Sequence, residues 1–248
     1  KLTETTPLRD VPVVVHVHRP GFEVRRPDRR PSYVFPDYWL DQMEKFCMVA
    51  ADGLVSPDAS LADSVEKTLD QPLAMASIPY PVPAGTFESP SEGRPGEAVY
   101  AGRLQPRNGV LTLVESCARR WSDGETFRLT LIGEDGELAP RGCTVGEYLR
   151  SRYGQWIEEG RLVLTGPLEE GETRQRLREA WVAVIPSHWE GFPDRCVEAL
   201  CGGQLVLGSS VGGQTEFLDP DGVNGFRFDW SREGDFEESL ARVFSLSP

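Results

Sequence analysis

The sequence contains one segment from which its architecture can be inferred, Trp181-Val182-Ala183-Val184-Ile185-Pro186-Ser187-His188-Trp189-Glu190-Gly191-Phe192-Pro193-Asp194-Arg195-Cys196-Val197-Glu198-Ala199-Leu200. Its apolar first part predicts a buried strand that Pro186 ends, and residues 195–201 predict an amphipathic helix. Glu190 therefore follows a strand, and Glu198 lies in the next helix. In an open parallel sheet, ligands bind where strands end and helices begin. Two carboxylates at that place suit hydrogen bonds to neutral hydroxyl groups, such as those of a sugar and a ribose.

The same alternation of strand and helix runs from residue 95 to residue 230. We predict strands at residues 98–101, 127–132, 162–164, 181–185 and 205–207. We predict helices at residues 111–121, 145–156, 172–180 and 195–201. This alternation is typical of an α/β fold with a doubly wound, Rossmann-like parallel sheet and helices on both faces. The strand endings would then share one edge of the sheet, where sites form.

The first third of the chain has a different pattern. It contains, in order, a predicted strand, helix, strand and helix at residues 11–17, 38–51, 53–56 and near 61–69. These elements are too few for a complete doubly wound domain, so we interpret residues 1–85 as part of one. Five prolines between Pro79 and Gly96 indicate a linker, which we place at 86–96 before a C-terminal domain at 97–248.

Composition and charge disfavour several classes of protein. The net charge of −13 argues against nucleic-acid binding, which needs a basic face. The apolar runs are too short to span a membrane, and we expect no secretory leader. Five cysteines without a C-x-x-C pattern favour reduced thiols in a cytoplasmic protein, and three scattered histidines give no case for a metal.

An arginine-rich loop at residues 19–31 stands out in this acidic chain. It contains Arg25, Arg26, Arg29 and Arg30. The simpler interpretation is a solvated loop. The alternative is contact with a phosphate-bearing acceptor or an anionic membrane surface, which would place the protein peripherally at the inner membrane face.

Five motifs follow one another in the predicted C-terminal domain. They are Tyr100-Ala101-Gly102-Arg103-Leu104, Leu131-Ile132-Gly133-Glu134, Leu164-Thr165-Gly166-Pro167-Leu168, the segment from Glu190 to Glu198, and Val211-Gly212-Gly213-Gln214-Thr215-Glu216. In this order and spacing they resemble the donor-binding half of retaining GT-B glycosyltransferases of the glycogen-synthase and phosphatidylinositol-mannosyltransferase group. The segment Val13-Val14-Val15-His16-Val17-His18 resembles the strand of the acceptor domain that presents a histidine. Residues 1–85 would then be a partial acceptor-side domain.

The resemblance implies an activity and its partners. A hexosyl group would move, with retention of its anomeric configuration, from a nucleotide-diphosphate sugar to a hydroxyl of a glycan, a lipid or a small metabolite. The nucleotide sugar is a co-substrate, and the resemblance implies neither a cofactor nor a metal. The departing diphosphate would help to take the acceptor proton, so neither Glu190 nor Glu198 need act as a nucleophile.

The resemblance and the chemistry together give three residues catalytic roles. Arg103, at a strand end, offers a guanidinium fork that suits phosphate, and negative charge builds on the phosphate oxygens as the diphosphate leaves. By resemblance, Glu190 holds hydroxyls of the transferred sugar. His18 would contact the donor sugar near its anomeric carbon, whereas we interpret His16 as structural.

A larger set of residues is predicted to contact the donor. Its members are Gly102, Arg107, Asn108, Gly133, Thr165, Gly166, Pro167, Leu168, Gly191, Phe192, Pro193, Glu198, Gly212 and Gly213. Glu198 would hold the ribose hydroxyls, and residues 165–168 would contact the base. Glycines after strands let a phosphate or sugar approach the backbone, although such glycines are as often turn residues. Gly212 and Gly213 would also open a helix whose amides and dipole favour an anion.

The sequence departs from the family pattern at three places. Asn108 stands where the family normally has a lysine, so either Arg107 substitutes or the leaving group is stabilised less strongly. Pro193 replaces a usual glycine, and Leu205 replaces a usual proline. Two alternatives stay open: a nucleotide-sugar-binding pseudoenzyme, and a GT-B-fold epimerase or hydrolase acting on the nucleotide sugar. A phosphorylase using pyridoxal phosphate is disfavoured, because no lysine lies in the donor half.

Overall fold

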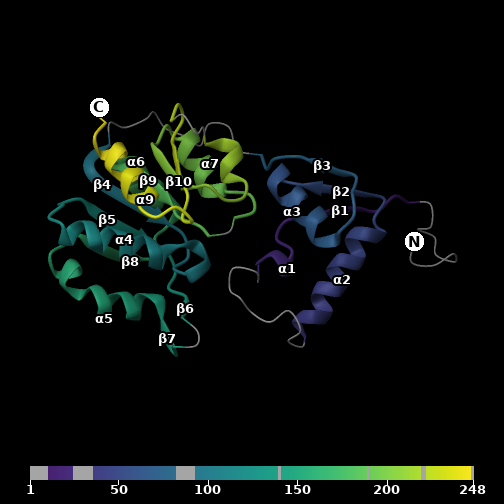
Figure 1. The fold of residues 1–248 in the computed structure, drawn as a ribbon, viewed down its shortest axis with the longest axis horizontal. Coiled ribbons are helices and arrows are strands. Elements are labelled where there is room, and N and C mark those ends of the chain that lie inside the picture. The colour runs from purple at the N-terminus through teal and green to yellow at the C-terminus, as the bar shows by residue number, and fades with distance from the viewer. Residues whose placement is uncertain are drawn as a thin grey trace. The chain divides into compact units, whose positions relative to one another are not determined.

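The computed structural model describes residues 11–24, 36–81, 93–138, 141–188, 190–218 and 222–246. The chain divides into two compact units, Lys1–Pro81 and Val82–Pro248 (Figure 1). The part of the predicted linker from residue 86 to 92 lies outside the described residues, as do Trp189 and the arginines Arg25, Arg26, Arg29 and Arg30 of the loop at 19–31. The first strand of the second unit begins at Arg94.

The second unit is built on one parallel sheet of six strands, in the order β11-β10-β9-β4-β5-β8. The strands are β4 (Arg94–Ala101), β5 (Arg128–Ile132), β8 (Leu162–Gly166), β9 (Ala180–Ile185), β10 (Val206–Ser209) and β11 (Phe226–Phe228). The predicted α/β class with a parallel sheet is confirmed. The chain builds outward from β4 to β8 on one side and then from β9 to β11 on the other. The strand order therefore reverses between β4 and β9, the kind of place at which such sheets bind ligands.

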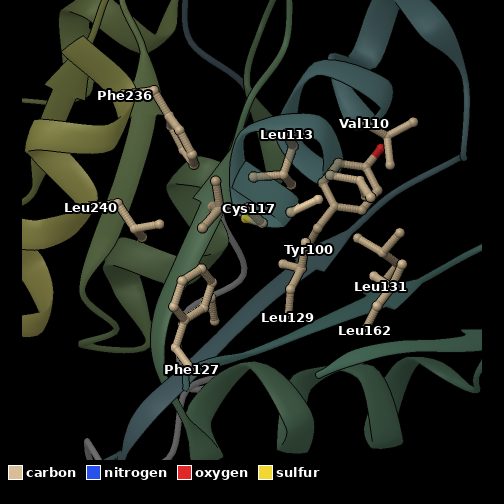
Figure 2. Packing of buried hydrophobic residues seen from close by; sticks show 14 of the residues in the cluster. Tyr100, Val110, Leu113, Cys117, Phe127, Leu129, Leu131, Leu162, Phe236 and Leu240 are labelled. Carbon is tan, nitrogen blue, oxygen red and sulfur yellow. The ribbon is translucent and has the colours of Figure 1, made fainter. Parts of the chain in front are cut away.

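Helices cover both faces of this sheet. They are α4 (Val110–Ser122), α5 (Val145–Glu158), α6 (Glu170–Glu179), α7 (Asp194–Cys201), α8 (Gln214–Phe217) and α9 (Asp235–Phe244). Because side chains alternate along a strand, Tyr100 of β4 packs in one cluster with residues of α4, α5 and α9, whereas Val99 packs in another with α6 and α7. Figure 2 shows part of the first cluster, with Leu113 of α4, Phe236 of α9 and Leu129 of β5 among its members.

The local sequence determines where helix α5 begins. Helix α5 begins after a capping box, in which the Thr144 hydroxyl accepts from the Glu147 amide and the Glu147 carboxylate accepts from the Thr144 amide. A short hairpin, β6 (Glu137–Leu138) with β7 (Cys143–Thr144), precedes it and was not predicted. Helix α9 was also missed, although Phe236, Leu240 and Val243 repeat at helical spacing and are buried.

The first unit contains a three-stranded parallel sheet in the order β1-β2-β3. Its elements are β1 (Val14–His16), α1 (Gly21–Val24), α2 (Asp37–Ala50), β2 (Gly53–Ser56), α3 (Ala59–Leu69) and β3 (Met75–Ser77). The predicted helices and the strand at 53–56 are present, whereas the strand predicted at 11–17 is shorter. Regular pairing with β2 covers only Val14–His16, and the apolar residues before it are exposed rather than buried. Helix α3 begins at the N-cap Asp58, whose carboxylate accepts from the Leu61 amide at 2.7 Å.

Candidate active site

The candidate site lies at the carboxyl edge of the six-stranded sheet, around the reversal of strand order. The loop after β4 carries Arg103, and the loop after β9 carries Glu190. The register sets Ala101 beside Ile132, so the loop after β5 follows directly alongside the loop after β4. Parallel strands thus bring three of the sequence motifs to one edge.

Glycines let the loops of this edge touch backbone to backbone. A Cβ atom on Gly133 (φ 143°) would collide with the carbonyl oxygen of Gly102, and one on Gly212 (φ 55°) would collide with that of Glu190. Gly109 (φ 74°), which was not predicted as a site residue, meets a carbonyl of the loop after β9 in the same way. Residues with side chains rarely adopt these φ values. The glycines therefore have a structural role in bringing the loops together, whatever ligand approaches them.

The guanidinium of Arg103 is exposed, whereas its backbone carbonyl is held by hydrogen bonds from two side chains. Its Nε lies 3.2 Å from Oε2 of Glu134, and both side chains are 65% exposed. The Tyr100 hydroxyl and the Asn108 amide both donate to the carbonyl oxygen of Arg103, at 2.7 and 2.9 Å. Burial raises the pKa of the Tyr100 phenol, so its hydroxyl stays protonated and remains a donor. An exposed ion pair such as that with Glu134 stabilises little, so an incoming phosphate can replace the carboxylate.

Arg107 and Asn108, both predicted to bind the donor, lie in a short 3-10 helix, η1 (Pro106–Asn108). The Arg107 carbonyl accepts from the His188 amide at 2.9 Å, which ties η1 to the loop after β9. The Asn108 amide nitrogen donates to the Arg103 carbonyl. The Asn108 side chain therefore supports the backbone of the loop that carries Arg103.

Replacing Asn108 by alanine should lower the free energy of unfolding by about 1 kcal/mol, because one hydrogen bond to the Arg103 carbonyl is lost. Denaturation with urea, followed by circular dichroism, measures this change. Asn108→Asp is the matched variant: its carboxylate has nearly the same shape but cannot donate, so it should cost at least as much. An unchanged free energy of unfolding in both variants would show that the Asn108 amide does not stabilise this loop.

Glu190 is held by a chain of polar groups that the sequence did not reveal. The Ser187 hydroxyl donates to Oε2 of Glu190 at 2.9 Å. The Ser209 hydroxyl donates to the Ser187 carbonyl at 2.6 Å, and Nε2 of Gln214 lies 3.4 Å from the Ser209 hydroxyl. All three supporting side chains are buried. Burial, with the nearby Glu190 charge second, raises the pKa of Cys196 to about 12, so this thiol stays neutral beside the site.

Glu198 lies on α7 and bonds to Arg195 of the same helix. Nη1 of Arg195 is 2.7 Å from Oε2 of Glu198 and 3.0 Å from Oε1 of Glu170, and Nη2 is 3.2 Å from Oε2 of Glu170. The sequence analysis did not identify Arg195 as the partner of Glu198. An arginine one helical turn before a glutamate was the available signal.

Other residues predicted to contact the donor differ in their burial and in their contacts. The Thr165 hydroxyl donates to the Gly166 carbonyl at 2.8 Å, Pro167 is exposed, and Leu168 packs against the cluster of α6 and α7. Phe192 is 8% exposed and meets Phe217 edge to face, with ring centroids 5.5 Å apart.

Three further members of that set are backbone or packing positions. Gly191 and Pro193 are buried, and Gly213 is the N-cap of α8. That helix spans only four residues, so the helix dipole predicted to favour an anion at Gly212 and Gly213 is weak.

His18, predicted to be catalytic, lies in the first unit. Its ring and that of His16 have centroids 4.0 Å apart, as expected for residues two apart on a strand, and Nδ1 is in hydrogen-bond contact with the Tyr80 hydroxyl. Desolvation and the neighbouring His18 lower the pKa of His16. A role of His18 toward the donor remains a prediction.

A hollow of about 680 Å³ lies elsewhere, at the amino edge of the sheet. Its lining includes Glu97, Phe127, Arg128, Glu159 and Arg161. Both arginines are engaged by carboxylates there, Arg128 by Glu97 and Arg161 by Glu159. This hollow is remote from the motif-bearing loops and forms no part of the candidate site.

Metal-ligand clusters and disulfides are absent from the described part of the chain. No group of three or more His, Cys, Asp or Glu side chains that could hold a metal occurs among the described residues. The five cysteines all fall within those residues, and each is free. Within the same ranges, every helix is too short or too polar to cross a membrane.

The fold is that of GT-B glycosyltransferases, and residues 95–245 match the family described as glycosyl transferases group 1. The chain belongs to that family. It is 24% identical over 220 residues to the lipopolysaccharide 1,2-N-acetylglucosaminetransferase of Salmonella typhimurium, covering 86% of this chain and 52% of the relative. The chain thus spans about half the length of this curated relative.

Solved structures share the fold at low sequence identity. Sucrose-phosphate synthase from Thermosynechococcus elongatus aligns with a TM-score of 0.73 at 20% identity, over 94% of this chain and 58% of its own. Anabaena HepE in complex with UDP aligns with a TM-score of 0.67 at 17% identity, over 94% of this chain and 61% of its own.

Proposed function

We propose that this chain acts in a retaining glycosyltransferase that moves a hexosyl group from a nucleotide-diphosphate sugar to a hydroxyl of a glycan, a lipid or a small metabolite. Residues 97–248 bind the donor, and residues 1–85 contribute to the acceptor side. The observation that carries this proposal is the placement of Arg103 and Glu190 on the loops after the neighbouring strands β4 and β9, where the strand order reverses, with the ion-paired Glu198 on the helix that follows. The UDP complex of HepE supports a nucleotide donor.

The proposed mechanism is the one that the family resemblance implies, with the residues of this edge in the roles given above. The bond between the anomeric carbon and the phosphate oxygen breaks, and a bond to the acceptor oxygen forms on the same face of the sugar. The acceptor proton passes to a phosphate oxygen of the leaving diphosphate. Arg103 exchanges Glu134 for that diphosphate and stabilises its growing charge. Glu190, fixed by Ser187, accepts hydrogen bonds from sugar hydroxyls, and no metal or cofactor takes part.

A second candidate is a nucleotide-sugar-binding protein without turnover. Asn108 supplies no positive charge where the family pattern has a lysine, and its amide is committed to the Arg103 carbonyl. Binding of the donor does not require this positive charge, whereas the departure of the diphosphate is faster when a positive charge stabilises it.

A screen of donors tests the proposal. UDP, GDP, ADP and TDP sugars are added to the chain, and one of them should raise its melting temperature. That donor is then offered with a panel of glycan, lipid and small hydroxyl acceptors, and the product linkage is determined by NMR. A product with retained configuration is expected. An inverted linkage would contradict the mechanism, binding without product would favour the second candidate, and no shift with any donor would refute both.

A further inference from the structure

Arg195 stands between two carboxylates from different helices. Its guanidinium binds Glu170 through both terminal nitrogens, at 3.0 and 3.2 Å, and binds Glu198 through Nη1 at 2.7 Å. Hydrogen bonding to Arg195 lowers the pKa of Glu170, and its two carboxylate partners raise the pKa of Arg195. Glu170 and Arg195 are therefore charged at neutral pH. Arg174 adds a longer contact of 3.8 Å to Glu170.

This cluster connects two elements of the carboxyl edge. Glu170 is the first residue of α6, directly after the loop that follows β8. Arg195 and Glu198 lie on α7, which begins after the loop that carries Glu190. The cluster therefore links the loop at 165–168 to the helix that carries Glu198.

The stability of α7 does not explain an arginine at this place. A positive side chain in the first turn of a helix opposes the helix dipole, at a cost of about 0.3–1 kcal/mol. Arg195 is the second residue of α7 and is partly exposed. Its favourable interactions are those with the two carboxylates.

The geometry also leaves Glu198 able to accept a ligand. Arg195 binds Oε2 of Glu198, and among the described residues no hydrogen bond or ion pair engages Oε1. Without the guanidinium, two carboxylates that now bind one nitrogen would face each other, and repulsion would turn one away or protonate it. A planar fork fixes the direction of its partners, which a single ammonium group does not.

We propose that Arg195 is a positioning residue that aims the Glu198 carboxylate at the ribose of the donor and so sets the preference for ribonucleotides over deoxyribonucleotides. The inference rests on the proposed function, because it takes Glu198 as the residue that holds the ribose hydroxyls. Arg195 itself acts through Glu198 and Glu170, not by touching the reacting atoms.

The test compares two ligands that differ only in one hydroxyl. Calorimetric titration of the parent chain with UDP and 2′-deoxy-UDP, or with ADP and 2′-deoxy-ADP, should show a preference for the ribonucleotide of about tenfold, as a hydrogen bond to a charged group supplies. In Arg195→Met the preference should fall below about threefold, whereas the deoxynucleotide should bind almost as before. Arg195→Lys, which keeps the charge without the fork, should be intermediate.

Two controls separate positioning from general damage. Arg128→Met makes the same chemical change in an ion-paired arginine at the opposite edge of the sheet, and it should leave the preference unchanged. The single variant Glu198→Gln should already lose the preference for the ribonucleotide. Adding Arg195→Met to Glu198→Gln should therefore not reduce this preference further.

The nucleotide affinities distinguish a failure of the Arg195 inference from a failure of the proposed function. If folded Arg195→Met and Arg195→Lys keep the tenfold preference, Arg195 does not position Glu198, and only this inference is overturned. Equal losses for both nucleotides would indicate a merely structural role and would overturn it too. If neither nucleotide binds the parent chain, the proposed function fails together with the inference.

Discussion

Replacing Arg103 by methionine should lower kcat/KM for sugar transfer by about a hundred- to a thousandfold, the usual loss when one preorganised donor to a developing anion is removed. Methionine keeps the length and apolar stem of the side chain but has no charge and no donor. The guanidinium is exposed and bound only to Glu134 in the described part of the chain, so nothing in the core depends on it. The melting temperature should therefore change little.

Steady-state kinetics with the donor identified by the screen measure the effect. Arg103→Lys should recover part of the activity, because an ammonium supplies charge but not a fork. The control is again Arg128→Met, which removes an ion-paired arginine at the amino edge and should leave kcat/KM unaltered. If Arg103→Met retains the parent rate while Arg107→Met loses it, the phosphate-binding arginine is the one in η1, and the assignment to Arg103 is wrong.

The strands and helices of the second unit could be predicted because the pattern of apolar residues records burial. Residues 181–185 are continuously apolar, and every residue of β9 is buried between helices on both faces. The same principle failed at residues 11–13, where the apolar side chains are exposed and regular pairing begins only at Val14. Hydrophobicity indicates that a segment can be buried, but not that a neighbouring element covers it.

The positions of the motifs at one sheet edge could also be predicted, because that follows from parallel strands alone. The contacts within the site could not. Ser187, Ser209 and Gln214 support Glu190 through a chain of bonds with no periodic signal, and the bond from Ser209 to Ser187 joins residues 22 positions apart. The direction of the Asn108 amide likewise depends on where the Arg103 carbonyl comes to lie after folding.

These contacts refine the picture of two carboxylates at one edge. Glu190 receives a neutral donor, the Ser187 hydroxyl, whereas Glu198 receives a guanidinium that also binds Glu170. A hydroxyl donor leaves the full charge of Glu190 available to sugar hydroxyls, whereas the guanidinium of Arg195 offsets part of the negative charge of Glu198, the residue expected at the ribose. The two carboxylates thus suit different parts of one donor.

Replacing Gly133 by alanine should destabilise the second unit by about 3 kcal/mol or more, because a side chain is forced into a conformation reserved for glycine and also collides. The added Cβ would lie 2.7 Å from the carbonyl carbon of Gly102 and closer still to its oxygen, at a φ of 143°. Both partners are backbone, so no side chain can turn away. The loops after β4 and β5 must separate, and Arg103 moves with them. For a domain of this size the melting temperature should fall by about 6–12 °C.

Gly154→Ala is the matched control for this change. Gly154 lies in α5, where an added Cβ meets no atom within 4 Å and φ is not positive. Alanine there removes conformational freedom from the unfolded chain, so stability should stay unchanged or rise by up to about 1 kcal/mol. Calorimetric melts of the two variants therefore should move in opposite directions. A Gly133→Ala variant that melts with the parent would mean that the loops of this edge do not touch in solution, because only their contact makes the glycine necessary.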